Sequence, residues 1–156
     1  YKRQKEIYKE PKWPSEPLFY ANFTSITNEH TAPLGCENGF ILIPLAPGLK
    51  DTEELREKYF NIVIERIESI TEQKIKNNII YKKSFCVSDF IEEYNSYKGN
   101  AYGLANTLLQ TSFLRPKLKS KLVKNMYFTG QLSVPGPGVP PAIVSGKLVA
   151  DLINNK

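Results

Sequence analysis

The sequence predicts a mixed α/β (α+β) fold in which helices flank a mixed sheet. Three observations lead to this prediction. An unbroken apolar run at 39–45 has the length of a buried strand and is followed by a Pro-Gly pair. Apolar residues then recur at helical spacing across 51–76. Finally, a short strand at 126–130, a loop rich in glycine and proline, and a helix at 139–153 with an apolar face are predicted to follow one another.

Length and composition are those of a globular domain. The 156 residues are 41% hydrophobic and 24% charged, which is enough apolar material to bury a core. The formal net charge of +5 is mild and suits an anionic membrane surface, an anionic ligand or no particular partner. We expect no membrane-spanning helix and no signal peptide. Two cysteines and one histidine predict neither a disulfide framework nor a metal site, and a reduced intracellular setting is expected.

The first part of the chain is predicted to contain two strands. Three prolines within residues 1–17 favour an extended lead-in, with a helical turn over 2–9 as an alternative for its start. Aromatic residues at 18–23, bounded by Pro17 and a polar pair, predict the first strand. The apolar run at 39–45 predicts the second, and its continuous character favours burial on both faces.

A long helix is predicted next, over 51–76. Asp51 suits the N-cap position, and Glu54, three residues later, completes a capping box. A further strand is expected at 79–87 and a short helix at 88–94. These elements would extend the sheet and cover it.

The segment 95–116 has no clean period. Its small residues beside aromatic ones can line a cavity or pack as a loop, and the sequence leaves both open. A solvated turn and a membrane-surface contact are the two interpretations of the basic stretch 115–124. Nucleic-acid binding is not expected there, because no aromatic residues alternate with the bases as stacking positions. The five basic residues of this stretch are Arg115, Lys117, Lys119, Lys121 and Lys124.

Glycine and proline are concentrated in the loop at 130–141, which holds seven of the chain's twenty. Glycine lets a ligand approach the backbone closely, and a helix start offers free N–H groups and a positive dipole end. The arrangement therefore suits an anion or a polar ring edge, while a plain turn between a strand and a helix is the alternative. The chain contains no Gly-x-Gly-x-x-Gly dinucleotide fingerprint.

Three ordered segments carry a resemblance to a known family. The last, MYFTGQLSVPGPGVPPAIVSGKLVADLI at 126–153, resembles the C-terminal FAD-binding segment of bacterial phytoene desaturases, which are carotenoid desaturases of the flavin-dependent amine-oxidase-like superfamily. APLGCENGFILIPLAPG at 32–48 and DFIEEYNSYKGNAYGLANTLLQTSFLRP at 89–116 resemble two further blocks of that family. The similarity covers about residues 17–154. After Gly130 the chain has Gln-Leu-Ser-Val where many members have Ala-Gly-Thr-His, so no role is carried over for that histidine.

The resemblance implies a C-terminal portion of an FAD-dependent enzyme that introduces double bonds into phytoene in carotenoid (lycopene-type) biosynthesis. It implies that 18–116 form part of a substrate domain. Residues 117–156 would supply the last strand and helix of a Rossmann-like FAD-binding domain. The chain alone is then expected to bind FAD poorly and to be inactive. A related desaturase or isomerase acting on another carotenoid and a non-catalytic interaction domain are the alternatives.

The resemblance also implies which residues form the site, although it gives no catalytic residue within this chain. FAD would contact the loop and the helix start, at Gly130, Gln131, Gly138, Val139, Pro140 and Ala142. The substrate channel would be lined by Tyr102, Leu104, Gln110 and Phe113. Because phytoene is a hydrocarbon, the implied partners are this polyene and a membrane surface. The enzyme is expected to be cytoplasmic and peripherally attached to the inner membrane.

Overall fold

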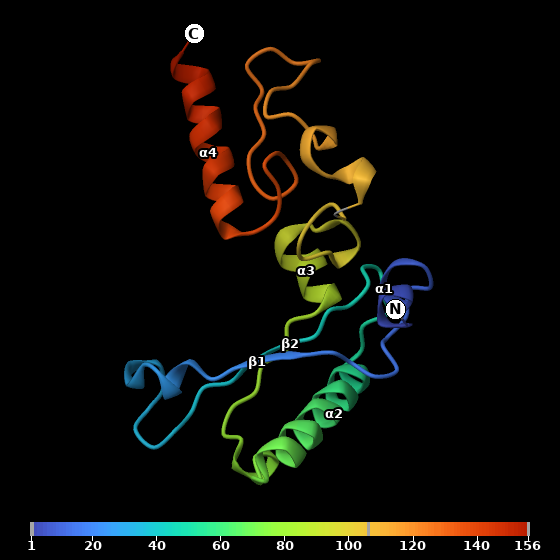
Figure 1. Cartoon of the computed structure of the whole chain (residues 1–156), viewed down its shortest axis with the longest axis vertical. Helices are drawn as coiled ribbons and strands as arrows, with labels where there is room; N and C mark the ends of the chain where they lie inside the picture. The colour runs from blue at the N-terminus through green and yellow to red at the C-terminus, as the bar shows by residue number, and fades with distance from the viewer. Residues whose placement is uncertain (1, 106, 156) are drawn as a thin grey trace. The chain divides into compact units, whose positions relative to one another are not determined.

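The computed structural model describes residues 2–105 and 107–155 of the chain. Within these ranges it contains four α-helices and one two-stranded antiparallel sheet, which confirms the predicted mixture of helix and sheet (Figure 1). The chain divides into two compact units, Tyr1–Asn100 and Ala101–Lys156. The predicted strands at 18–23 and 39–45 fall in the first unit, and the glycine- and proline-rich loop falls in the second.

The N-terminal segment begins as helix α1 (Lys2–Tyr8) and then runs as an irregular chain against helix α2 (Glu53–Thr71). Trp13 lies on Tyr59 with the ring centroids 4.6 Å apart, and the Tyr59 hydroxyl donates to the Pro14 carbonyl at 2.7 Å. The helical turn, which was the alternative for the start of this segment, is therefore present. The prolines come only after it, where no helical N–H is needed.

The sheet pairs β1 (Tyr20–Asn22) with β2 (Phe40–Leu42), and Tyr20 lies opposite Leu42. Both strands predicted in this region are present, although each is only three residues long. The expectation that the second strand is buried on both faces is wrong, since Phe40 is 57% exposed. Among the described residues, no further strand extends this ribbon. A sheet of only two strands is too small to be buried on both of its faces.

Helix α2 begins after a different cap from the one predicted. Thr52 is the N-cap, and its hydroxyl accepts the Leu55 amide at 3.4 Å. The Asp51 carboxylate is instead committed to an ion pair with Arg56. One face of the helix supplies much of the core of the first unit, through Tyr59, Val63, Ile64 and Ile67.

Helix α2 ends at Thr71 and does not continue to residue 76. Glu72 adopts a left-handed conformation with φ of 57°. The Glu68 carboxylate then accepts the amides of Ile75 and Lys76, at 2.5 and 2.8 Å. This side-chain cap satisfies backbone donors beyond the helix, so the chain leaves the helix earlier than its sequence pattern suggests.

The prediction of a strand at 79–87 is wrong. Residues 79–85 are irregular, and Ile80 and Tyr81 are 87% and 79% exposed. Among the described residues, no strand lies in position to pair with this apolar segment. The short helix predicted at 88–94 is confirmed as α3 (Val87–Tyr94).

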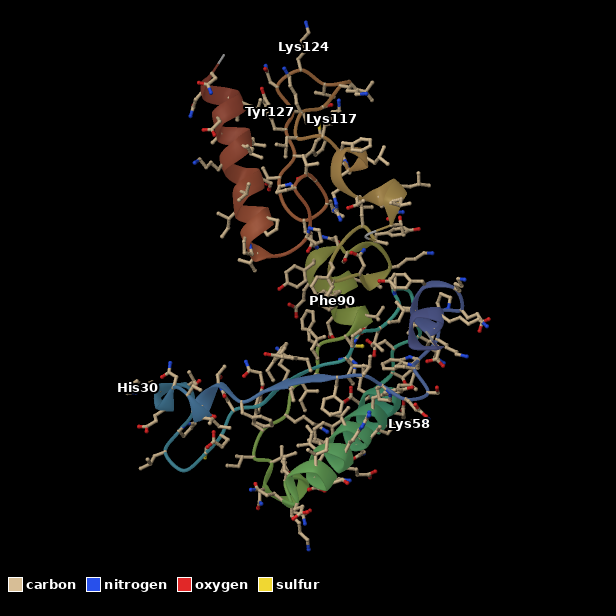
Figure 2. The ribbon with its side chains drawn as sticks, in the orientation of Figure 1. His30, Lys58, Phe90, Lys117, Lys124 and Tyr127 are labelled. Carbon is tan, nitrogen blue, oxygen red and sulfur yellow. The ribbon has the colours of Figure 1, made fainter. Side chains whose placement is uncertain are left out.

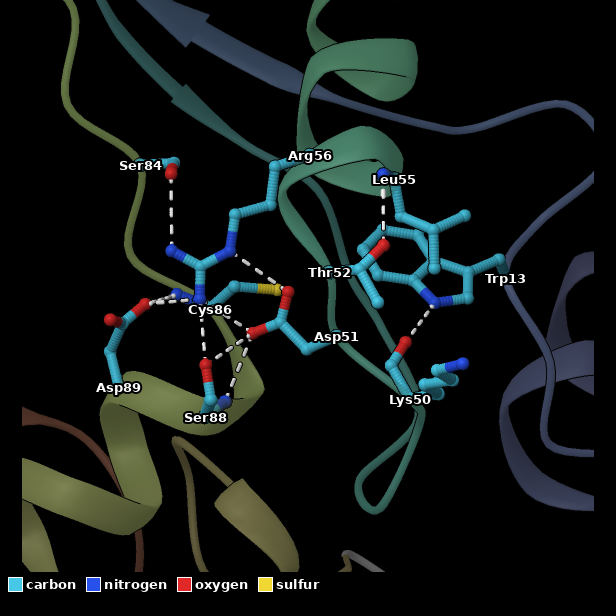
Figure 3. A network of polar contacts seen from close by, with 10 residues as sticks. All are labelled: Trp13, Lys50, Asp51, Thr52, Leu55, Arg56, Ser84, Cys86, Ser88 and Asp89. Carbon is cyan, nitrogen blue, oxygen red and sulfur yellow. Dashed lines mark hydrogen bonds and ion pairs between the residues drawn. The ribbon is translucent and has the colours of Figure 1, made fainter.

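A polar network ties the start of α2 to the start of α3 (Figure 3). The Asp51 carboxylate accepts Nε and Nη2 of Arg56, at 2.9 and 2.6 Å, together with the amide and hydroxyl of Ser88. Arg56 also contacts Asp89 at 2.7 Å and the Ser84 hydroxyl at 3.2 Å. The hydrogen bonds from Arg56 hold the pKa of Asp51 well below its usual range, against the opposing effect of burial.

The second unit ends in helix α4 (Val139–Asn154), which confirms the helix predicted at 139–153. The strand predicted at 126–130 is reduced to a single antiparallel bridge between Lys119 and Tyr127. Gly130, with φ of +96°, turns the chain out of an extended course at that point. In the described part of the chain, no helix combines the length and the apolar character needed to span a bilayer.

Candidate functional site

The glycine- and proline-rich loop of residues 130–138 leads directly into α4 in the second unit. Two of the predicted cofactor-binding residues, Gly130 and Gln131, begin this loop, and Gly138 ends it as the N-cap of α4. The other three lie in the first turn of the helix: Val139, Pro140 and Ala142. The structure therefore places all six on one continuous loop and helix start.

Two buried hydroxyls fix the start of the loop at Gly130. The Gly130 amide donates to Oγ of Ser145 on α4, at 2.7 Å, and its carbonyl accepts the amide and hydroxyl of Ser133, at 3.2 and 3.0 Å. Ser133 and Ser145 are 2% and 0% exposed. Because both polar groups of Gly130 are satisfied inside the protein, the loop is held in one conformation before any ligand arrives.

Arg115 braces the loop from the other side. Its Nη1 donates to the Gln131 carbonyl at 3.1 Å, and the side chain is buried. At Gly136, where φ is +141°, an added Cβ would lie 3.5 Å from the Arg115 Nε. Arg115 was expected to belong to an exposed basic stretch, and for this residue both the solvated-turn and the membrane-contact interpretations are wrong. Its guanidinium instead satisfies a backbone carbonyl of the loop.

The start of α4 offers two backbone donors toward the loop. Gly138, at φ of +110°, and Val139 use their amides in no hydrogen bond among the described residues. Pro140 has no N–H group, and the Ala142 amide donates to the Gly138 carbonyl at 3.0 Å. Pro140 and Ala142 therefore contribute a small apolar surface, while Gly138 and Val139 present N–H groups at the positive end of the helix dipole.

A glycine brings the predicted substrate segment against the predicted cofactor loop. At Gly103, with φ of +79°, an added Cβ would lie 2.7 Å from Leu132 Cδ2 and 3.6 Å from the Gln131 carbonyl oxygen. A side chain at this position would have to push the Leu132 side chain aside and would also be strained by the positive φ. The backbone between Tyr102 and Leu104 thus packs directly on residues 131–132 of the loop.

The structure brings two of the four predicted channel residues close to the loop. Tyr102, 60% exposed, and Leu104, half-buried, flank Gly103. Gln110 closes a local turn, with Oε1 accepting the Ala105 amide at 3.0 Å. Phe113 is 81% exposed. Whether the four line a single channel remains a prediction.

Reasoning from the sequence missed the residues that shape the loop from beneath: Gly103, Arg115, Ser133 and Ser145. A serine in an apolar-faced helix was a usable signal, because Ser145 occupies a core position of α4 and must find a buried partner there. No comparable signal marked Arg115, which stands in a run of lysines.

The residues of the loop fit one edge of a flavin. The donors are neutral amides at a helix start, which suit a ring edge that gains negative charge on reduction. An added Cβ at Gly130 would meet nothing within 4 Å, so its backbone is open on the side away from Ser133 and Ser145. The buried hydroxyls are already satisfied, and they hold the loop without competing for a ligand.

Sequence comparisons identify relatives of the chain. No protein-family profile matches the chain. It is 43% identical over 148 residues to a carotenoid 3,4-desaturase of Haloarcula japonica, and the match covers 95% of this chain and 30% of the relative. A 4,4'-diapophytoene desaturase (4,4'-diaponeurosporene-forming) of Staphylococcus haemolyticus is 33% identical over 147 residues, covering 90% and 29%. A 4,4'-diaponeurosporene oxygenase of Staphylococcus aureus is 31% identical over 158 residues, covering 99% and 31%.

These relatives are all named as enzymes that oxidise carotenoids. Over nearly all of its length this chain is a homologue of the carotenoid desaturases, which confirms the resemblance identified in the sequence. The chain spans about 30% of the length of the curated relatives it matches. Their names include both desaturases and an oxygenase.

Proposed function

We propose that this chain is the C-terminal portion of an FAD-dependent carotenoid desaturase, which introduces double bonds into a polyene such as phytoene. The observation that carries the proposal is the contact of Gly103 with the loop at Gln131 and Leu132. This contact brings residues 102–104, which are expected to contact the substrate, against the loop of residues 130–138, which is expected to contact the cofactor. The homology to carotenoid desaturases supports the same assignment.

In this proposal the chain's residues position the reactants. Bound FAD would supply the oxidant for a desaturation in which two adjacent carbons lose two electrons and two protons in total, so that a C–C single bond becomes a double bond. The amides of Gly138 and Val139 would face the edge of the flavin ring where negative charge grows. Because the loop is already fixed, these donors would not have to reorganise during the reaction. Tyr102 and Leu104 would present carbon surface that holds the polyene and excludes water.

The domain assignment is part of the proposal. Residues 117–156 would complete a Rossmann-like FAD-binding domain, and 18–116 would belong to a substrate domain. The chain divides into its two units between Asn100 and Ala101. Segment 101–116 therefore shares a unit with the loop. This is the arrangement expected of a segment that carries substrate-facing residues to the flavin. We further propose that the complete enzyme works in the cytoplasm at the inner membrane, where its polyene dissolves.

Oxygenation of a carotenoid is a second candidate function. The observation that favours it is the 31% identity to a diaponeurosporene oxygenase, across 99% of this chain. Desaturation or isomerisation of another carotenoid would use the same loop. The geometry of the loop does not distinguish these reactions, because it concerns the cofactor rather than the substrate carbon that reacts.

Expression of the complete gene product in a phytoene-producing host, followed by mass spectrometry of the pigments, tests the proposal. A desaturase yields coloured products that have lost pairs of hydrogen atoms, whereas an oxygenase yields products that have gained oxygen. An isomerase leaves the mass unchanged. Purified protein without flavin and a host without new products would together reject the proposal in favour of a non-catalytic interaction domain.

A further inference from the structure

We propose that the hairpin of residues 117–128, the basic hairpin, docks on an anionic membrane surface. Its lysines would contact lipid headgroups while Leu122 and Val123 enter the boundary between headgroups and acyl chains. The inference stands on the shape, exposure and charge of this hairpin and not on the reaction that the enzyme catalyses.

Hydrogen bonds within the basic hairpin hold it in shape. The Phe128 amide donates to the Leu118 carbonyl at 2.8 Å, and the Ser120 amide donates to the Met126 carbonyl at 3.0 Å. Beyond this pairing the tip is closed by Ser120, whose hydroxyl accepts the amides of the next two apolar residues at 3.2 and 3.0 Å. Asn125 completes the reversal at φ of 63°. The tip is therefore held in a defined shape.

Two adjacent apolar side chains stand at this tip. Leu122 is 96% exposed and Val123 is 52% exposed. Single exposed apolar residues are ordinary on a protein surface, but these two lie side by side at the apex of a turn between Lys121 and Lys124. Apolar residues flanked by lysines are the pattern of segments that lie in a membrane interface.

The charge of the basic hairpin is of one sign. Four exposed lysines are distributed along the hairpin, whereas Arg115 is buried against the loop and does not contribute. Figure 2 shows Lys117 at the base of the hairpin and Lys124 at its tip. No acidic residue lies between Glu93 and Asp151. The hairpin therefore carries four positive charges without a carboxylate nearby in sequence.

The charge of the whole chain is divided in the same way. Residues 101–156 contain seven basic residues and one acidic residue, whereas residues 1–100 contain fourteen basic and fifteen acidic residues. The positive charge of the chain thus belongs to the unit with the basic hairpin. An anionic bilayer complements both the lysines and the apolar tip, whereas a nucleic acid would leave the apolar tip without a partner.

Vesicle cosedimentation of the complete gene product tests the proposal, with phosphatidylcholine vesicles that contain or lack phosphatidylglycerol. Binding is expected only with the anionic lipid and is expected to weaken as salt rises. The triple variant Lys119→Gln, Lys121→Gln, Lys124→Gln should bind about a hundredfold more weakly. Neutralising three exposed lysines of the first unit, Lys58→Gln, Lys74→Gln, Lys83→Gln, is the charge-matched control and should leave binding near wild type.

The apolar tip has its own matched pair of variants. Leu122→Ser with Val123→Ser should weaken binding about tenfold or more, because the apolar area that enters the interface is lost. Leu108→Ser with Leu109→Ser removes two adjacent exposed apolar residues of the same unit that have no lysines beside them, and should change binding little. Equal losses in the two double variants would overturn the proposal.

A direct readout does not depend on affinity. Leu122→Trp should show quenching of its fluorescence by lipids that carry a quencher near the acyl boundary, and Leu109→Trp should not. Absence of quenching at residue 122, or a triple lysine variant that loses oligonucleotide binding while it still binds vesicles, would overturn the proposal. Desaturation of a detergent-dispersed polyene should be unaffected by the variants within the basic hairpin, so failure of this inference and failure of the proposed function are distinguishable.

Discussion

Gly130 joins three parts of the second unit through its backbone alone. Its amide reaches Ser145 on α4, its carbonyl reaches Ser133 within the loop, and its φ of +96° sets the direction of the chain that follows. On the side away from these contacts the residue is open. A single glycine thus fixes the loop from one side and leaves the other side available to a ligand.

Replacing Gly130 by alanine should therefore abolish retention of flavin by the complete protein. The added Cβ would project into the open side, and the positive φ would be strained at a cost of about 1–2 kcal/mol. Gly35→Ala is the matched control, because Gly35 also has a positive φ of 76° with nothing within 4 Å of an added Cβ. Flavin content per protein, measured by absorbance, should fall for Gly130→Ala and stay at the wild-type value for Gly35→Ala. Equal flavin in both variants would remove Gly130 from the site.

The pair of Asp51 and Arg56 should make the first unit sensitive to acid. The native pKa of Asp51 lies below its unfolded value of about 3.9, so the pair stabilises the fold above that pH and the stabilisation is lost as pH falls toward the native pKa. Asp51→Asn should lower the free energy of unfolding by about 3 kcal/mol at neutral pH, with a smaller loss in acid. Urea unfolding at neutral and acidic pH measures this difference. Glu65→Gln, on the exposed face of α2, should follow the wild type at both.

The two cysteines should differ in reactivity. Burial raises the pKa of the Cys86 thiol, and the side chain is only 9% exposed. Cys36 is half-buried in a surface loop. Alkylation of the native protein, followed by mass spectrometry, should therefore modify Cys36 first, and Cys86 should react at a comparable rate only in denaturant. Faster modification of Cys86 in the native protein would contradict the packing around the start of α3.

At the scale of elements, α4 is fixed by features in its N-terminal half. Its start has prolines at the second and third positions, so the first turn is rigid but poor in donors. Further along, Ser145 connects the helix to the loop, and Gly146 beside it has open space where a Cβ would lie. The helix is therefore anchored near its start and carries a flexible residue directly after the anchor.

Gly146→Ala should stabilise α4 by roughly 0.5–1 kcal/mol, because alanine loses less backbone entropy in a helix and meets no neighbouring atom. Urea unfolding followed by circular dichroism measures the gain. Gly39→Ala is expected to have no such gain, since its Cβ would lie 3.1 Å from the Phe23 ring. Destabilisation by Gly146→Ala in the complete protein would show that another segment packs closely on this face of α4.

At the scale of the whole molecule, the sequence predicted the helices well and the sheet poorly. The two later helices, α3 and α4, lie close to their predicted ranges, because capping and apolar spacing are local properties of the chain. The strands predicted at 79–87 and 126–130 needed distant partners, and the described residues provide at most one bridge. Pairing is not encoded in a segment of five to nine residues, which explains the difference.

The loop and the helix start of the candidate site were predictable from glycine and proline, the side chains that support the loop were not, and the cofactor contacts stay a prediction. All six residues expected at the cofactor lie on the loop or the first turn of α4. The supporting contacts come from Arg115 and Ser145, which are distant in sequence from the residues they hold. The inference of an exposed stretch of five bases failed at Arg115 because charge in a sequence does not reveal burial.

The 156-residue chain alone should not retain FAD, whereas the complete gene product should. The loop supplies two amides and a small apolar surface, and the chain spans about 30% of its curated relatives. Gel filtration followed by absorbance in the flavin band measures retention, with circular dichroism as the check that the chain is folded. Stoichiometric flavin on the folded chain would show that residues 1–156 contain a complete binding site.

The close packing of Gly103 on Leu132 has a consequence for signalling between substrate and cofactor. The place of the absent Cβ at Gly103 lies 3.6 Å from the Gln131 carbonyl oxygen, which is van der Waals contact, so a displacement of residues 101–104 toward the loop would press on its start. A polyene seated against Tyr102 and Leu104 would therefore disturb the surroundings of the flavin ring. The colour of the bound flavin would then report whether the substrate is in place before any hydrogen has been transferred.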